Sequence, residues 1–171
     1  MSFDSRLVSG VACVVLASLL ACSATMGVRP EGDVIRTSGS IRFEVYEGAV
    51  CGDAGSSPVG RCSRATYTGG LRGVGHTAIQ RLEAVAPDGM FFVTENEVLG
   101  LTDGQLRSLV NAVFHSKSPD GEVASLHTIT GGTGRYAGAS GHIQLWRAHG
   151  ERFDYVAVVR LGAAETAPPR E

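Results

Sequence analysis

Short runs in which apolar and polar residues alternate dominate the chain between residues 38 and 162. In the run SIRFEVYE at residues 40–47, Ile41, Phe43 and Val45 fall on one face of an extended segment, with polar residues and Tyr46 on the other. The run RFDYVAVVRLG at residues 152–162 shows the pattern most clearly, with one face formed by Phe153, Tyr155, Ala157, Val159 and Leu161. A period of two residues is typical of half-buried β-strands.

Further runs with this rhythm lie at residues 63–71, 76–86, 89–101, 122–130 and 141–148. In the run at 76–86, we assign one face to Ala78, Leu82 and Ala84, and the other to Ile79 and Val85. Glycine-bearing turns separate the runs, such as the APDG sequence at residues 86–89. Proline and glycine at these positions favour a tight turn between neighbouring strands.

The segment at residues 102–116 fits two patterns. Leu106, Leu109, Val110 and Val113 are spaced as on one face of a helix, and Thr102 with Gln105 could form a capping box. The segment also reads as a strand, and Gly104 weakens the helical alternative. Because strand patterns flank it, we favour a strand. With it, about eight strands without alternating helices predict an all-β antiparallel barrel or sandwich.

One stretch, GGTGRYAGASG at residues 131–141, contains five glycines in eleven residues. It lacks the Lys-Ser/Thr pair of a phosphate-binding loop and the spacing of a dinucleotide-binding turn, so a structural corner is the better interpretation. Glycine at a corner allows backbone conformations and close approaches that other residues resist. We therefore assign a structural role to Gly131, Gly132, Gly134, Tyr136, Gly138 and Gly141, and also to Arg135.

This corner resembles the GGTGxYAGAxG signature of the allene oxide cyclase barrel-like and dirigent superfamily. The match is local, and the strand rhythm of residues 41–161 is similar to the same barrel. The resemblance implies a closed eight-stranded antiparallel barrel, in which Tyr136 folds over one end, and an interior without metal or cofactor. Plant members cyclise an unsaturated fatty-acid epoxide or guide radical coupling. The cyclases' catalytic residues have no matching motif here, so activity must be argued from the interior residues.

The N-terminus is predicted to be a targeting segment. Residues 7–21 form an uncharged apolar run that follows Arg6 and precedes Cys22, and the sequence LLAC at 19–22 resembles the bacterial lipobox. The resemblance implies a signal peptide at 1–21, lipidation of Cys22, and an extracytoplasmic protein tethered to a membrane. The alternative is an ordinary secretory signal with Cys22 incidental. We expect a tether at 22–37, the barrel domain at 38–162 and a flexible tail at 163–171.

Two further cysteines, Cys51 and Cys62, bracket a loop rich in glycine and serine. In an exported protein such a pair predicts a disulfide bond. Zinc is the alternative, but no histidine lies near enough in sequence to complete a ligand set. The five histidines of the chain also lack the i,i+2 or i,i+4 spacing that places metal ligands side by side. We expect neither a metal nor a cofactor.

Composition narrows the remaining classes. The 171 residues, 43% of them hydrophobic, are sufficient for one globular domain. A net charge of −2 and the absence of any lysine- or arginine-rich run argue against a nucleic-acid partner. No serine occupies a G-x-S-x-G elbow, so nothing points to a hydrolase.

Candidate chemistry lies in the run FFVTENEVLG at residues 91–100. Glu95 and Glu97 share a face with Phe91 and Val93 if the strand is regular, and carboxyl groups among apolar neighbours can act as a general acid or base. The alternative is that both point outward, as most glutamates do. We expect Tyr67 to face the same interior, and Asn111 as well if its strand has the appropriate register.

Three functions remain open. The first is an exported barrel that binds a small apolar or amphipathic molecule, or serves the cell envelope, without catalysis. The second is a cyclase or isomerase that confines a flexible unsaturated substrate, with Glu95 or Glu97 as the acidic group. The third is protein–protein interaction through the loop between Cys51 and Cys62.

Overall fold

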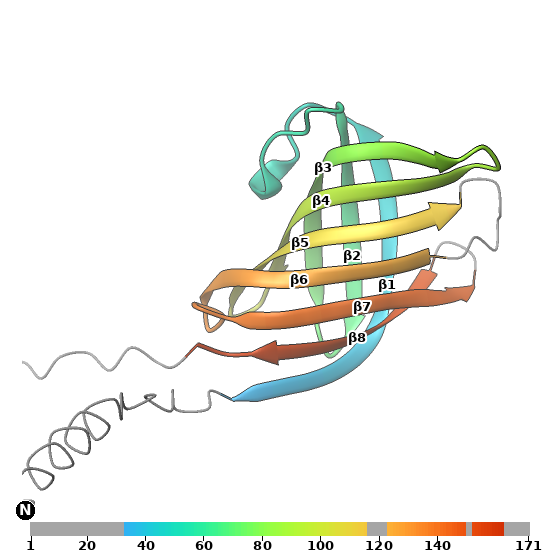
Figure 1. Cartoon of the computed structure of the whole chain (residues 1–171). Coiled ribbons are helices and arrows are strands. Elements are labelled where there is room, and N and C mark those ends of the chain that lie inside the picture. The colour runs from blue at the N-terminus through green and yellow to red at the C-terminus, as the bar shows by residue number, and fades with distance from the viewer. Residues whose placement is uncertain (1–32, 116–122, 150–151, 163–171) are drawn as a thin grey trace, which may run out of the picture. The chain divides into compact units, whose positions relative to one another are not determined.

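The alternating segments form β-strands in the computed structural model, which describes residues 33–115, 123–149 and 152–162. The described elements are β1 (Val34–Glu47), a 3-10 turn η1 (Gly52–Ala54), β2 (Arg61–Gly69), β3 (Gly73–Ala86), β4 (Met90–Leu101), β5 (Gly104–His115), β6 (Val123–Gly134), β7 (Ser140–His149) and β8 (Arg152–Arg160). Each strand pairs antiparallel with its neighbours in sequence, and β1 also pairs with β8. The result is the expected closed eight-stranded barrel (Figure 1).

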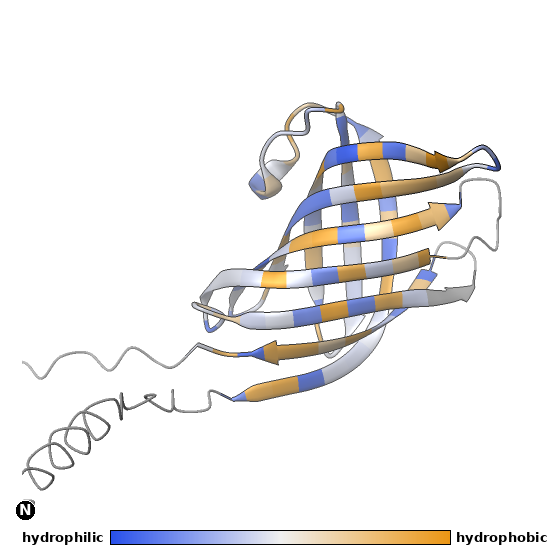
Figure 2. Ribbon diagram, viewed as in Figure 1, coloured by the Kyte–Doolittle hydropathy of each residue, from blue (hydrophilic) through white to orange (hydrophobic). Residues whose placement is uncertain are grey.

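The ambiguous segment is a strand, β5, as we predicted. Its inner face carries Leu106, Val110 and Ala112, all buried. The helical alternative fails because tertiary pairing with β4 and β6 satisfies the backbone of this segment along its whole length. Figure 2 shows the alternation of apolar and polar residues along the strands, which lets one face fill the barrel.

β1 begins at Val34, inside the segment expected to be a tether. Residues 34–37 pair with the end of β8, and this pairing closes the barrel. At its other end β1 extends past the start of β8, because the pairing of these two strands stops at Arg42. Val45 is therefore 66% exposed, although it has the same parity as the buried Ile41.

A bulge in β3 corrects the predicted faces of residues 76–86. The pairing with β4 shifts by one residue between Ile79 and Arg81. After the shift Leu82 packs with Ile79 and Val93 in the interior, whereas the buried Ala78 packs with Cys51 and Cys62. Because one inserted residue exchanges the two faces of a strand, no uniform alternation describes β3.

Cys51 and Cys62 form the predicted disulfide bond. Cys62 pairs with Ala78 across β2 and β3, and η1 contacts β3 and β4, so the loop covers the outer face of these strands. Gln105 on β5 donates a hydrogen bond to the Asp53 carboxylate at 3.1 Å. The loop is thus held by the disulfide bond and by this hydrogen bond close to Cys51.

The glycine-rich stretch at residues 131–141 spans the end of β6, the turn at 135–139 and the start of β7. Gly134 has φ +58°, and a Cβ there would lie 2.3 Å from the carbonyl oxygen of Asp103. Arg135 donates its backbone N–H to that same carbonyl at 2.9 Å, and Tyr136 is buried in the main core. Close backbone approach and a left-handed conformation account for this glycine.

The main core extends from the end of the barrel where β4 finishes to Phe43 and Phe153. It contains Leu99, Leu106, Ile143 and Val159. Tyr155 ties this core to the β2–β3 turn, because its hydroxyl accepts a hydrogen bond from the Leu71 N–H at 2.8 Å. Among the described residues no helix is long and apolar enough to span a membrane.

Candidate functional site

The inner face of β4 changes character along the barrel axis. From one end to the other it presents Phe91, Val93, Glu95, Glu97 and Leu99. Glu97 is 2% exposed, so the alternative in which both carboxylates point outward is wrong for this residue. The regular pairing of β4 with β5 over the whole strand keeps the two carboxylates on the inner face.

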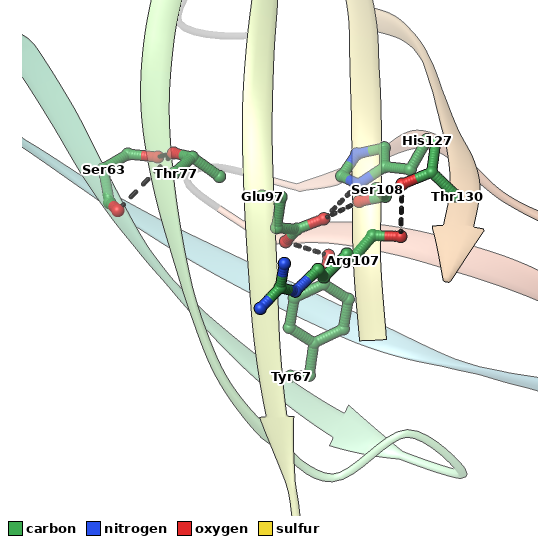
Figure 3. Close-up of polar contacts among 8 residues, drawn as sticks. All are labelled: Ser63, Tyr67, Thr77, Glu97, Arg107, Ser108, His127 and Thr130. Carbon is green, nitrogen blue, oxygen red and sulfur yellow. Dashed lines mark hydrogen bonds and ion pairs between the residues drawn. The ribbon is translucent and has the colours of Figure 1, made fainter. Parts of the chain in front are cut away.

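Three side chains from three other strands meet the Glu97 carboxylate (Figure 3). The Tyr67 hydroxyl of β2 donates to Oε1 at 2.6 Å, and the Ser108 hydroxyl of β5 donates to Oε2 at 2.8 Å. His127 Nδ1 of β6 lies 2.7 Å from Oε2. We call Tyr67, Glu97, Ser108 and His127 the interior cluster.

The interior cluster holds Glu97 in its ionised form. Burial alone would raise the pKa of Glu97, but the attraction of His127 and hydrogen bonds from His127, Tyr67 and Ser108 together lower it below its ordinary value. An ionised carboxylate only accepts hydrogen bonds, so His127 carries a proton on Nδ1. The same burial, with the negative charge of Glu97, raises the pKa of Tyr67 well above its ordinary value.

The other ring nitrogen of His127 is unsatisfied. Nε2 is buried and has no hydrogen-bond partner among the described residues. A buried polar atom in a native protein is nearly always paired with protein, water or ligand. Nε2 is therefore the atom of the interior cluster at which a further polar group can bind.

Gly75 on β3 makes room for the contact between Tyr67 and Glu97. A Cβ at Gly75 would lie 2.9 Å from Glu97 Oε1 and 3.4 Å from Tyr67 Cε2. The ring of Tyr67 also packs edge to face on Tyr155, with centroids 5.7 Å apart. This packing fixes the direction in which the Tyr67 hydroxyl points.

Glu95 lies one inward position from Glu97 and has a different electrostatic environment. Burial and the negative charge of Glu97 raise its pKa from 4.5 to about 7, although His127 and a hydrogen bond with Thr77 oppose the change. Thr77 is itself bonded to the Ser63 hydroxyl. Near neutral pH the two forms of Glu95 are similarly populated, so this carboxyl group can give or take a proton.

Beyond Glu95, the end of the barrel is lined by half-buried phenylalanines. Phe91 stacks on Phe114 with ring centroids 5.6 Å apart, and Phe43 contacts Phe153 edge to face at 5.6 Å. Phe114 packs with Val93 and Ala112, whereas Phe43 and Phe153 pack against the main core. All four lie toward the end of the barrel where β4 and β8 begin. We call these four residues the phenylalanine rim.

The structure brings together most of the residues expected at the site. Tyr67, Phe91, Val93, Glu95 and Glu97 all lie on the inner face. Asn111 does not, because it alternates with the buried Val110 and Ala112 and pairs with Leu126, which is 45% exposed. The prediction for Asn111 is therefore wrong. Cys22 lies outside the described residues.

Two members of the interior cluster, Ser108 and His127, were missed as site residues. Each lies on a strand where both faces carry apolar residues, since Leu109 and Leu126 point outward although they are leucines. Alternation alone could not decide which face of β5 or β6 is inside. The one signal for them was Glu97 on β4, because a carboxylate on an inner face needs polar partners from other strands.

In the described part of the chain, no group of three or more histidine, cysteine, aspartate or glutamate residues is placed to hold a metal ion. Comparisons with protein-family models, with curated proteins and with solved structures give no match to this chain.

Proposed function

We propose that the protein is an exported, lipid-anchored barrel that binds a small amphipathic molecule at the phenylalanine rim, with the polar group of that molecule on Glu95. The supporting observation is the order of residues along the inner face of β4. Apolar Phe91 and Val93 precede the titrating Glu95, and the interior cluster follows. Binding sites for small molecules commonly combine an apolar lining with a few placed polar groups.

Each part of this site has a role in recognition. The rings of the phenylalanine rim are half-buried and supply apolar contact area. Glu95 supplies a hydrogen bond or a negative charge, depending on pH. The closed main core beyond Glu97 limits how deeply a ligand can enter, because Leu99 and Leu106 are buried there.

The proposed location outside the cytoplasm is based on the N-terminal sequence. The apolar run 7–21 followed by Cys22 supports export and lipidation. A disulfide between Cys51 and Cys62 fits an oxidising compartment. The corner at residues 131–141 supports kinship with the allene oxide cyclase barrel-like superfamily, whose eight-stranded barrel has the same strand number.

Native mass spectrometry of the full chain, released gently from its own membrane, tests the proposal first. We expect an acyl mass on Cys22 and a small molecule retained by the folded barrel. A chain with no acyl mass would overturn the anchor. A barrel that carries no ligand and binds neither probe in the following experiment would overturn the binding function.

The charge of Glu95 provides a sharper test. We expect a long-chain alkylamine to bind more tightly at pH 8 than at pH 6, because Glu95 is ionised at the higher pH, and a fatty acid of equal length to show the opposite trend. Glu95→Gln should abolish both trends. Leu126→Ala, on the outer face of β6, is the matched control and should leave them unchanged.

A second candidate function is that of a cyclase or isomerase. The observation that favours it is the pKa of Glu95, which lies close to neutral pH. Glu95 would transfer the proton, and the negative charge of Glu97 in the interior cluster would keep the pKa of Glu95 raised. An unsaturated fatty-acid epoxide is the substrate to test, with cyclised product detected by mass spectrometry. We expect Glu95→Gln to lower such an activity about 10²-fold or more. An activity unchanged in Glu95→Gln would exclude this mechanism.

A further inference from the structure

A row of four residues crosses the outer face of the barrel, away from the interior cluster. Thr68 of β2 is in register with Ser40 of β1, Ser40 with Asp154 of β8, and Asp154 with Trp146 of β7. All four have the parity opposite to the buried Tyr67, Ile41, Tyr155 and Leu145. In Figure 1 these strands lie side by side along the closure of the barrel.

The row lies in a groove. A hollow of about 520 Å³ opens here, and its lining includes Ser38, Ser40, Thr68, Trp146, Arg152 and Asp154. Only small side chains line the floor of the groove, because residues 38–40 of β1 are serine, glycine and serine. Trp146 stands beside this floor and is 43% exposed. Tryptophan is mostly buried in proteins, so an exposed indole beside a groove indicates a surface that binds a ligand.

The polar groups of the groove are arranged around the indole. The Ser40 and Thr68 hydroxyls bond to each other at 2.9 Å, which fixes their positions. Asp154 is directly across from Trp146, and Arg152 lies one outward position before Asp154, at the start of β8. Within the described residues, no ion pair engages either Asp154 or Arg152. Their carboxylate and guanidinium groups are thus available for a ligand.

We propose that this groove binds a pyranose ring of a glycan, stacked on Trp146, with its hydroxyls bonded to Asp154 and Arg152. The axial C–H groups of a sugar are slightly positive, and the face of an indole is negative, so the two surfaces attract. Vicinal hydroxyls match the remaining groups, because a carboxylate accepts two hydrogen bonds and a guanidinium donates several. The site is separate from the phenylalanine rim and does not depend on it.

The charges of the groove favour this ligand over a purely apolar one. A purely apolar partner would bury Asp154 and Arg152 without satisfying their hydrogen bonds, which is unfavourable. A neutral polyol satisfies both and still uses the exposed indole.

Intrinsic fluorescence tests the proposal directly, because Trp146 is the only tryptophan of the chain. Titration with chitotetraose, cellotetraose and maltotetraose should give a saturable change in emission with at least one of them. We expect Asp154→Asn to weaken that binding at least 10-fold. Tyr46→Ala removes an exposed aromatic residue from β1 outside the groove, so it is the control and should bind as the wild type does.

Calorimetry completes the test, since variants of Trp146 lack the fluorescent reporter. Trp146→Ala should lose binding, and Trp146→Phe should retain part of it because an aromatic face remains. Circular dichroism of each variant establishes that the barrel is folded. The proposal is overturned if none of the three sugars produces a saturable signal, or if folded Trp146→Ala binds as tightly as the wild type.

Discussion

At the scale of single residues, Glu97 determines the electrostatics of the barrel interior. Replacement by Gln removes the charge that Tyr67, Ser108 and His127 all face. It also introduces an NH2 group that points at side chains which themselves donate hydrogen bonds to Glu97. We expect Glu97→Gln to lower the free energy of unfolding by about 3 kcal/mol, since breaking a buried hydrogen-bonded pair leaves its partners unsatisfied. Urea denaturation at pH 7 measures this loss.

Glu44→Gln is the control for that experiment. Glu44 also faces a cation, Arg64 at 4.0 Å, but both side chains are largely exposed. Its replacement should change the free energy of unfolding by less than about 1 kcal/mol. If the two variants were equally stable, the interior cluster would contribute no more than a surface pair.

Glu95 should make the barrel less stable as the pH rises. Its pKa is about 7 in the folded protein and near 4.5 as an ordinary glutamate, so the folded state retains the proton longer. The contribution of Glu95 to the free energy of unfolding is therefore complete at acid pH. It declines by up to about 3 kcal/mol as the pH rises from 4.5 to just above 7. Glu97, whose pKa is lowered, acts in the opposite direction and only in more acidic solution.

Glu95→Gln isolates this effect from the histidines that titrate in the same range. We expect the variant to be more stable than the wild type at pH 8 and similar to it at pH 5, as measured by denaturant unfolding at both values. Glu83→Gln removes an exposed carboxylate from β3 and should show no such difference. A wild type with the same pH profile as Glu95→Gln would contradict the raised pKa.

The sequence allowed one half of the site to be predicted. Glu95, Glu97 and Tyr67 were found because apolar residues on the same face marked the inside of their strands. Ser108, His127 and Asn111 lie on strands with apolar residues on both faces, so their orientation depended on register with β4. Register is a tertiary property, and short-range patterns do not contain it.

At the scale of elements, the loop between Cys51 and Cys62 is the part that a covalent bond stabilises. We expect the Cys51→Ala/Cys62→Ala double variant to lose about 2–3 kcal/mol, because the unfolded chain gains the entropy that the short closed loop withholds. Thermal melting of the variant and of the reduced wild type measures the effect. Equal melting temperatures with and without the bond would show that the loop is held by Ala78 and Gln105 alone.

The elements themselves were largely predictable, and the exceptions have local causes. The period of two residues marked the strands, including β5, although helical spacing was also present there. The bulge between Ile79 and Arg81 was not predicted, because two apolar residues (Ala78 and Ile79) followed by two polar ones (Gln80 and Arg81) do not reveal which of the apolar pair faces the interior. Ala78 was assigned to the wrong face for this reason.

At the scale of the whole molecule, barrel closure joins residues far apart in sequence. β1 and β8 pair Val34 with Arg160, and this contact can form only after the chain between them is ordered. We expect refolding from guanidinium, with the disulfide intact, to take milliseconds to seconds, as in other proteins dominated by non-local strand pairs. Stopped-flow fluorescence of Trp146 follows this step. Complete recovery of the signal within microseconds would contradict it.

The same closure has a consequence for how the chain can be reconnected. The Leu161 N–H donates to the Asp33 carbonyl at 3.0 Å, so both ends of the described barrel lie next to each other. A circular permutant that joins these ends with a short Gly/Ser linker, and opens the turn between Ala86 and Met90, would keep every strand pairing. The order in which the strands are synthesised is thus separable from the order in which they surround the interior.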